Sequence, residues 1–349
     1  MNVKIFSVIA FLLIFSCKKK VEISKSSEIL PISSLVELSE SPEMVKLRSG
    51  KHQYQFSKKK LPFQNVVLLN ASLIGYISEL ELENKMVGVS SPEYIYSEKI
   101  LKAIKEGKIQ NIGNEQKYDI ERIISLKPDA VFTNYIASFE NTYEILEKNN
   151  IEVIFLDEYL EQQPLEKSAY LKVFGKLFGV EAKANSRFES IKKNYEDLKK
   201  LASGKVEKPL VLANEMYGNQ WFLPGGKTQL AYFIADAGGN YLMSENADAK
   251  AVPLSFEEVF KKSENAKIWV NIGNHKQKNE LLTINPNYAK MQVFQNGKLY
   301  SLTGKERGKA NDFFESGVVR SDLVLKDYIK IMHPDLFAKD PLNYMSELK

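Results

Sequence analysis

Cysteine and histidine are scarce in this chain of 349 residues, which contains one cysteine and three histidines. A disulfide within the chain needs two cysteines, so core burial must stabilise the fold. Transition-metal sites usually need clustered histidines, so a bare Zn²⁺ or Mn²⁺ site is disfavoured. Blocks of one charge are also missing: 48 Lys and Arg are interspersed with 44 Asp and Glu. This near balance gives no indication of a nucleic-acid partner.

The apolar residues that come first form a short N-terminal run. Lys4 precedes an almost entirely apolar stretch, 5–15, followed by Ser16 and Cys17. The stretch is shorter than the about 20 residues of a membrane-spanning helix, and its layout is that of a secretory signal. A thiol directly after the cut resembles a bacterial lipoprotein signal, in which the cysteine is acylated. An ordinary signal peptide with an unrelated cysteine is the alternative, since Phe15 is bulkier than lipoprotein signals usually carry.

We therefore expect residues 1–16 to be a removed signal peptide and Cys17 to carry lipid. Residues 17–60 are polar, and we predict that they form a tether holding the body off a membrane. Part of 53–57 alternates enough to add an edge strand. The expected location is the cell envelope, lipid-anchored on the extracytoplasmic (periplasmic) face of a bacterial membrane.

The body of the chain alternates short aliphatic strands with helices. Predicted strands include 66–69, 86–89, 130–133 and 153–156, and a second series opens at 209–213. This alternation predicts an α/β fold with two Rossmann-like lobes and mostly parallel sheets. The predicted domains are an N-terminal lobe (61–180), one long backbone helix (181–203), a C-terminal lobe (204–337) and a tail (338–349).

The backbone helix is predicted from one apolar stripe, and a further helix is expected just before it. The stripe repeats at steps of four and three; its members are Ala184, Phe188, Ile191, Tyr195 and Leu198. The preceding helix is predicted over 168–178 and is closed by Gly179.

Five segments resemble one family in both sequence and order: 85–89, 120–129 ("IERIISLKPD"), 223–227, 236–241 and 333–336. The chain resembles the helical-backbone class of ABC-importer substrate-binding proteins, which carry cobalamin, iron–siderophore complexes or haem. The resemblance covers 61 to about 337. It implies ligand capture between two lobes, delivery to an ABC permease with its ATPase, and a monomeric binding protein. A rigid connecting helix should permit only small closing motions.

Ligands of open α/β sheets bind beyond the carboxyl ends of the strands. Residues in those positions are the candidate ligand contacts: Asn70, Ser72, Tyr94, Tyr96, Asn134, Tyr135, Tyr217, Trp221, Asn274, His275 and Arg307. Aromatic surfaces with a few polar groups suit a bulky chelate or macrocycle.

Each candidate has a simpler structural interpretation. Trp221 and its neighbour Phe222 are equally well explained by packing under the lobe. Asn70 and Asn134 are also common turn formers. Arg307 has a guanidinium that matches a carboxylate, phosphate or catecholate, although it also lies in a lysine-rich loop.

The ligand itself stays open between several classes. His275 as a haem ligand would need an open coordination face, so a polar position at the rim is the preferred interpretation. We rank iron–siderophore and cobalamin together, ahead of haem. No cofactor and no metal site are expected in the protein itself.

The resemblance also implies one permease-docking glutamate on each lobe. Glu140 and Glu257 match those places, and Glu258 is the alternative to Glu257. Both begin helices, where a carboxylate also interacts favourably with the helix dipole.

Enzyme functions are less well supported. The fragment 225–228 lacks the first glycine of a phosphate-binding loop, because Trp221 stands there. No G-x-S-x-G turn is present. Two alternatives remain: a membrane-anchored hydrolase that uses carboxylates, and an envelope scaffold without a ligand.

Overall fold

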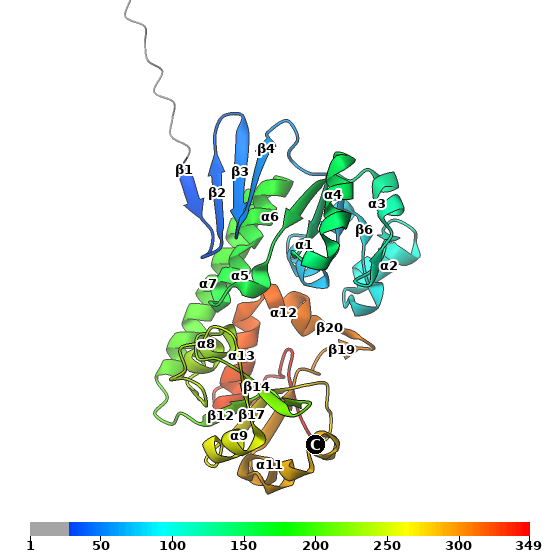
Figure 1. The fold of residues 1–349 in the computed structure, drawn as a ribbon. Coiled ribbons are helices and arrows are strands. Elements are labelled where there is room, and N and C mark those ends of the chain that lie inside the picture. The colour runs from blue at the N-terminus through cyan, green and yellow to red at the C-terminus, as the bar shows by residue number, and fades with distance from the viewer. Residues whose placement is uncertain (1–27) are drawn as a thin grey trace, which may run out of the picture.

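The structure, a computed structural model, describes residues 28–349, so the predicted signal peptide and Cys17 lie outside the described residues. Two α/β lobes lie one above the other, and helix α7 runs along one side of both (Figure 1). This arrangement is the predicted fold class. No helix within 28–349 is both long enough and apolar enough to cross a membrane.

The first described residues form an antiparallel sheet of four strands in chain order. These strands are β1 (Glu28–Pro31), β2 (Val36–Glu40), β3 (Met44–Ser49) and β4 (His52–Ser57). Alternate apolar side chains, among them Val36, Leu47 and Phe56, are buried in the core of the N-terminal lobe. The tether predicted for 17–60 is therefore wrong for 28–57. The edge strand expected at 53–57 is present as β4, which pairs with β3.

The N-terminal lobe contains a five-stranded sheet in which every pair is parallel. Its order is β11 (Glu152–Phe155), β10 (Ala130–Thr133), β5 (Val66–Leu68), β6 (Met86–Val89) and β7 (Gln110–Asn111). Strands β5, β6, β10 and β11 are largely buried on both faces, as their aliphatic runs predict, whereas the edge strand β7 is not. A small hairpin follows, formed by β8 (Gly113–Asn114) and β9 (Lys117–Tyr118). The helices of this lobe are α1 (Ile74–Glu79), α2 (Glu98–Lys105), α3 (Ile120–Leu126) and α4 (Glu140–Lys148).

Three helices then connect the lobes. The helix predicted over 168–178 is in fact two, α5 (Pro164–Ala169) and α6 (Leu171–Phe178), separated at Tyr170. Helix α7 (Glu181–Ser203) has the predicted bounds and buries the predicted stripe, with Leu198 only partly covered. Helix α13 (Ser321–Met332) packs along it.

The C-terminal lobe has a second five-stranded sheet. Its order is β15 (Asn240–Tyr241), β12 (Leu210–Ala213), β17 (Ile268–Ile272), β18 (Lys298–Ser301) and β21 (Ser346–Glu347). Only β21 is antiparallel to its neighbour. The tail predicted for 338–349 is wrong, because it supplies β21 and buries Tyr344 and Leu348 in the lobe core.

Smaller elements complete this lobe. A three-stranded antiparallel sheet contains β13 (Met216–Tyr217), β14 (Gln220–Pro224) and β16 (Ala251–Leu254). A hairpin is formed by β19 (Glu306–Arg307) and β20 (Ala310–Asn311). The remaining helices are α8 (Gln229–Asp236), α9 (Phe256–Lys262), α10 (Lys278–Ile284), α11 (Gln292–Asn296) and α12 (Ser316–Val319).

Candidate functional site

The carboxyl ends of the two parallel sheets face each other. The loop after β6 in the N-terminal lobe meets the hairpin that follows β18 in the C-terminal lobe. Arg307 Nη2 of that hairpin donates a hydrogen bond to the carbonyl oxygen of Tyr96 at 2.6 Å. Because side chains beyond carboxyl ends form the ligand sites of open α/β sheets, the region between the lobes is the candidate site.

Three predicted contacts in the N-terminal lobe converge on a glutamate. Ser72 Oγ donates to Glu158 Oε1 at 2.6 Å, and Asn134 Nδ2 lies 2.9 Å from Glu158 Oε2. Asn70 donates to the side-chain oxygen of Asn134. We call these four residues the Glu158 network. Asn70, Ser72 and Asn134 follow two strand ends, as predicted, and Glu158 adds a third. The four side chains form many of their hydrogen bonds with one another.

Glu158 itself was not among the predicted site residues. It follows β11 by three positions and is only 2% exposed, and burial raises its pKa. Lys167 on α5 lies near Glu158 and Glu161, and burial lowers the pKa of this lysine against the opposing effect of the two carboxylates. The signal available in the sequence was the run of acidic residues directly after a buried strand.

Tyr135 lies just after β10 and contacts residues of the four-stranded sheet β1–β4. Its hydroxyl donates to Glu140, and this hydrogen bond raises the pKa of Tyr135. Lys51 Nζ lies 4.1 Å from the centre of the Tyr135 ring, and the His52 ring centre lies 5.4 Å away. The sheet formed by 28–57 therefore contributes groups beside a predicted ligand contact.

Tyr94, Tyr96 and Arg307 also come together, but across the boundary between the lobes. The Arg307 guanidinium carbon lies 5.3 Å from the Tyr96 ring centre, and Lys309 Nζ lies 5.6 Å from that of Tyr94. Arg307 Nη1 is also 3.4 Å from Glu98 Oε1. The guanidinium is thus engaged by protein groups, so its predicted role as an open anion site is not what the structure presents.

His275 is held between two carboxylates in the C-terminal lobe. Its Nε2 lies 3.0 Å from Glu215 Oε2, and its Nδ1 lies 3.4 Å from Glu280 Oε2. The carboxylates face opposite nitrogens of the ring, so the three groups do not converge on one point. Among residues 28–349 no group of three or more His, Cys, Asp or Glu is arranged to hold a metal ion. Asn274 is exposed next to His275, and Tyr217, the last residue of β13, is 82% exposed.

Trp221 does not face the candidate site. It has no exposed surface, its Nε1 donates to the Ala213 carbonyl at 3.0 Å, and its ring lies 5.3 Å from that of Trp269. Alternation along β14 buries Trp221 and leaves Phe222 38% exposed. The prediction of Trp221 as a ligand contact is therefore wrong, and packing under the lobe is the correct interpretation.

The two predicted docking glutamates both lie in the first turn of a helix and are exposed. In α9, Ser255 and Glu258 form a capping box, with Glu258 Oε2 accepting from the Ser255 backbone N–H at 2.8 Å. Glu257 makes no hydrogen bond or ion pair with any residue of the described part of the chain. Its carboxylate is thus the one available at this position.

Comparison with known proteins agrees with this geometry. The family described as "Periplasmic binding protein" matches residues 66–306. A periplasmic haem-binding protein of Pseudomonas aeruginosa has a similar structure, with a TM-score of 0.60 and 18% identity over 82% of this chain and 98% of that one. The Helicobacter pylori protein CeuE, solved with Ni(II) bound, gives a TM-score of 0.63 and 17% identity over 85% and 92%.

Curated relatives come from one archaeon. An uncharacterised lipoprotein of Methanocaldococcus jannaschii is 21% identical over 81% of this chain and 68% of its own length. An uncharacterised protein of the same organism is 24% identical over 79% and 84%. The family match spans more than half of the sequence and includes most elements of both lobes. The chain therefore belongs to the periplasmic binding protein family.

Proposed function

We propose that this protein is the lipid-anchored substrate-binding protein of an ABC importer. It holds a bulky metal chelate or corrinoid between its lobes and delivers that ligand to a membrane permease served by an ATPase. The observation that carries the proposal is the pair of opposed carboxyl edges, joined by one helix of 23 residues, α7. Two faces fixed by a rigid helix suit a large ligand, because binding then needs little closure.

An iron–siderophore complex or cobalamin is the proposed cargo. The groups offered by the lobes include tyrosines and lysines, and these match a large ligand with an anionic rim. Haem is the second candidate, and it is favoured by the name of the structural neighbour from Pseudomonas aeruginosa. The nickel-bound neighbour also supports a ligand that contains a metal.

Tryptophan fluorescence tests the proposal. Trp221 and Trp269 both lie behind the strand ends of the C-terminal lobe, with Trp269 Nε1 donating to the Asn214 carbonyl at 2.5 Å. We would titrate the full chain with cyanocobalamin, haem, a ferric catecholate and a ferric hydroxamate, all of which absorb light and quench. We expect saturable quenching by one compound, a raised melting temperature with that compound, and recovery of the ligand unchanged.

The controls separate the other functions. His275→Ala should weaken the quenching, whereas Glu264→Ala, an exposed change beyond α9, should leave it intact. Chemical turnover of a bound compound would indicate the membrane-anchored hydrolase. Absence of both quenching and a thermal shift across all four compounds would reject the proposed binding function and favour the scaffold.

Lipid anchoring at Cys17 is part of the same proposal. It is supported by the residues before Cys17 and by the lipoprotein name of a Methanocaldococcus jannaschii relative. Mass spectrometry of the protein purified from membranes should find acyl groups on Cys17, and Cys17→Ser should release the chain from the membrane fraction.

A further inference from the structure

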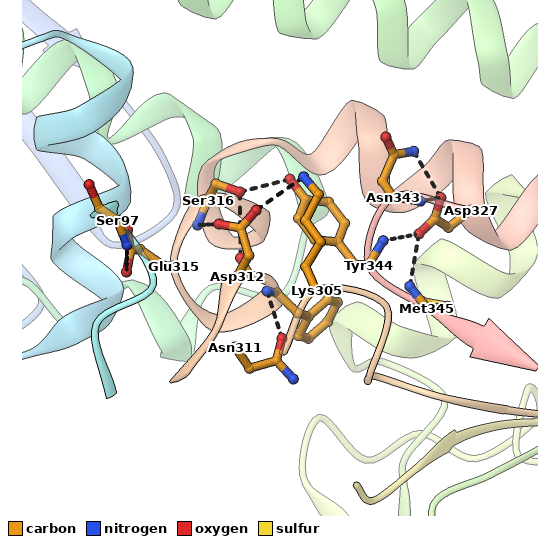
Figure 2. A network of polar contacts seen from close by, with 11 residues as sticks. Ser97, Lys305, Asn311, Asp312, Glu315, Ser316, Asp327, Asn343, Tyr344 and Met345 are labelled. Carbon is orange, nitrogen blue, oxygen red and sulfur yellow. Dashed lines mark hydrogen bonds and ion pairs between the residues drawn. The ribbon is translucent and has the colours of Figure 1, made fainter. Parts of the chain in front are cut away.

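A buried carboxylate of the C-terminal lobe binds backbone groups of the N-terminal lobe. Glu315, directly before α12, accepts hydrogen bonds from the N–H group of Tyr96 at 2.7 Å and from that of Ser97 at 3.1 Å. Figure 2 shows the contact with Ser97. Glu315 is only 4% exposed. These bonds join residues more than 200 positions apart in the sequence, and Glu315 lies where the chain passes from the C-terminal lobe to α12, which packs on α1.

Arg307 also binds the loop 95–97. It donates to the carbonyl oxygen of Tyr96 at 2.6 Å, while Glu315 accepts from the N–H of the same residue. Both backbone groups of Tyr96 are therefore bound by side chains of the opposite lobe. We call Arg307, Glu315 and the loop 95–97 the interlobe clamp.

The packing of α12 against α1 fixes the backbone next to the interlobe clamp. A Cβ atom on Gly75 of α1 would lie 2.3 Å from the carbonyl oxygen of Glu315, so only glycine permits this approach of α12 to α1. Val319 of α12 is buried in the hydrophobic core of the N-terminal lobe. The position of Glu315 is thus fixed by the backbone as well as by its side chain.

We propose that Glu315 is a positioning residue that sets the separation of the two lobes, and with it the width available to a ligand between them. The separation is a property of the protein alone. The effect on ligand affinity rests on the proposed function, because Tyr94 and Tyr96 are candidate ligand contacts carried by the clamped loop.

The charged surroundings of Glu315 give the clamp a pH dependence. Burial raises the pKa of Glu315 to about 7; the hydrogen bonds from the Tyr96 and Ser97 N–H groups and the charge of Arg307 oppose this shift, and Asp312 adds to it. Asp312 is paired with Lys305 at 3.2 Å, and Glu98 lies on the other side of Arg307. The other titratable or charged groups on the elements packed here are Tyr96, Glu79 of α1, Arg320 and Tyr344.

The sign of this dependence follows from linkage. With the lobes apart, Glu315 would be solvated and would titrate near its ordinary value. The clamped state therefore binds the proton more tightly, so clamping is most favourable at acidic pH and weakens as pH rises through about 7.

The test measures lobe separation directly by double electron–electron resonance. Spin labels would be placed on the exposed positions Gln116 and Lys290, one in each lobe, as Q116C and K290C in the full chain carrying Cys17→Ser. We expect a narrow distance distribution at pH 5.5 that broadens at pH 8, a broad one at both pH values for Glu315→Ala, and no pH dependence for Glu315→Gln.

Asp327→Asn is the matched control. Asp327 is also buried and also accepts backbone N–H bonds, from Asn343 and Tyr344 at 2.7 Å each, but both partners lie in its own lobe (Figure 2). Its substitution should lower the melting temperature and leave the distance distribution unchanged. Arg307→Ala, at a more exposed residue, should broaden the distribution even if Glu315→Ala folds poorly.

Two results would overturn the proposal. One is a wild-type distribution in both Glu315→Ala and Arg307→Ala; the other is equal broadening in Asp327→Asn. The failure of all four test ligands to bind would count against the proposed function and not against the clamp, since the distances need no ligand. With a ligand that binds, we expect about tenfold weaker affinity in Glu315→Ala, as for the loss of a single hydrogen bond.

Discussion

The two lobes use the same edge of a parallel sheet in different ways. In the N-terminal lobe, polar groups beyond the strand ends close on one another around Glu158. In the C-terminal lobe, Arg307 and Glu315 extend outward and bind the backbone of the opposite lobe. Because the Glu158 network forms its hydrogen bonds within the N-terminal lobe, the shape of that surface does not depend on the C-terminal lobe. Arg307 and Glu315 form their hydrogen bonds with the N-terminal lobe, so these bonds depend on the arrangement of the two lobes.

The helices α4 and α9, which carry the glutamates proposed for docking, differ in a similar way, and they give the prediction with the largest effect. Glu140 on α4 is held by Tyr135, whereas the Glu257 side chain on α9 makes no hydrogen bond or ion pair within residues 28–349. We expect the double variant Glu140→Ala/Glu257→Ala to abolish uptake in cells, while the ligand affinity of the purified protein stays unchanged. Radiolabelled uptake and fluorescence titration measure the two quantities.

The matched control for docking is Glu144→Ala/Glu264→Ala, which removes two exposed glutamates near the same helices. Normal uptake is expected there. Loss of ligand affinity in the Glu140/Glu257 variant would reject the docking assignment, and the two single variants would show whether the constrained or the unconstrained glutamate matters more.

The core of the C-terminal lobe gives the next largest effect. Trp221→Ala removes a fully buried indole that packs on Trp269, so we expect the free energy of unfolding to fall by about 4 kcal/mol. Phe222→Ala, at the next position but on the open face, should change it by less than about 0.5 kcal/mol. Urea unfolding followed by circular dichroism checks both, and similar losses at the two positions would contradict the burial argument.

The Glu158 network gives a somewhat smaller effect in the N-terminal lobe. Glu158→Ala leaves Ser72 and Asn134 without their shared acceptor, and we expect a loss of about 3 kcal/mol. Glu158→Gln keeps one acceptor oxygen and should lose less. Urea unfolding at several pH values distinguishes the three proteins.

The raised pKa of Glu158 also predicts a direction with pH. The folded protein keeps this proton to a higher pH than the unfolded chain does. This contribution to stability is therefore complete at acidic pH and falls as pH rises towards the folded-state value. Glu158→Gln should lack this component, and an identical pH profile in that variant would show that another group is responsible.

The smallest predicted effect concerns the start of α9. Ser255 Oγ accepts from the Glu258 N–H at 3.2 Å, so Ser255→Ala should cost about 1 kcal/mol of stability. Glu257→Ala should lower the melting temperature less than Ser255→Ala does, because Glu257 takes no part in the cap and loses only its interaction with the helix dipole. Calorimetry of the two variants tests this division between a structural and a docking role.

Much of the fold was predictable from short aliphatic runs. Strands such as Ala130–Thr133 and the helix Glu181–Ser203 are specified by local patterns, a buried run and a stripe with a helical repeat. The N-terminal sheet carries a period of two at Val36, Leu38, Val45 and Leu47. That signal was obscured by the polar and charged residues on the opposite face, which gave the segment the composition of a tether.

The site was less predictable, because its contacts join distant residues. Position after a strand correctly brought Asn70, Ser72 and Asn134 together, but it did not indicate that Glu158 would occupy their hydrogen bonds. Arg307 looked like an open cation, since its partners lie more than 200 residues earlier. Trp221 would lie in the core or in a ligand site depending on which face of its strand it occupies. The neighbouring residues in the sequence do not determine that face.

The N-terminal sheet has a consequence for encounter with the permease. With lipid on Cys17, as proposed, β1 begins 11 residues after the anchor, a reach of roughly 40 Å at full extension. This short connection confines the protein to a thin layer above the bilayer. Confinement to this layer raises the concentration of the protein beside other proteins of the same membrane above its value in free solution, which favours even a weak docking contact.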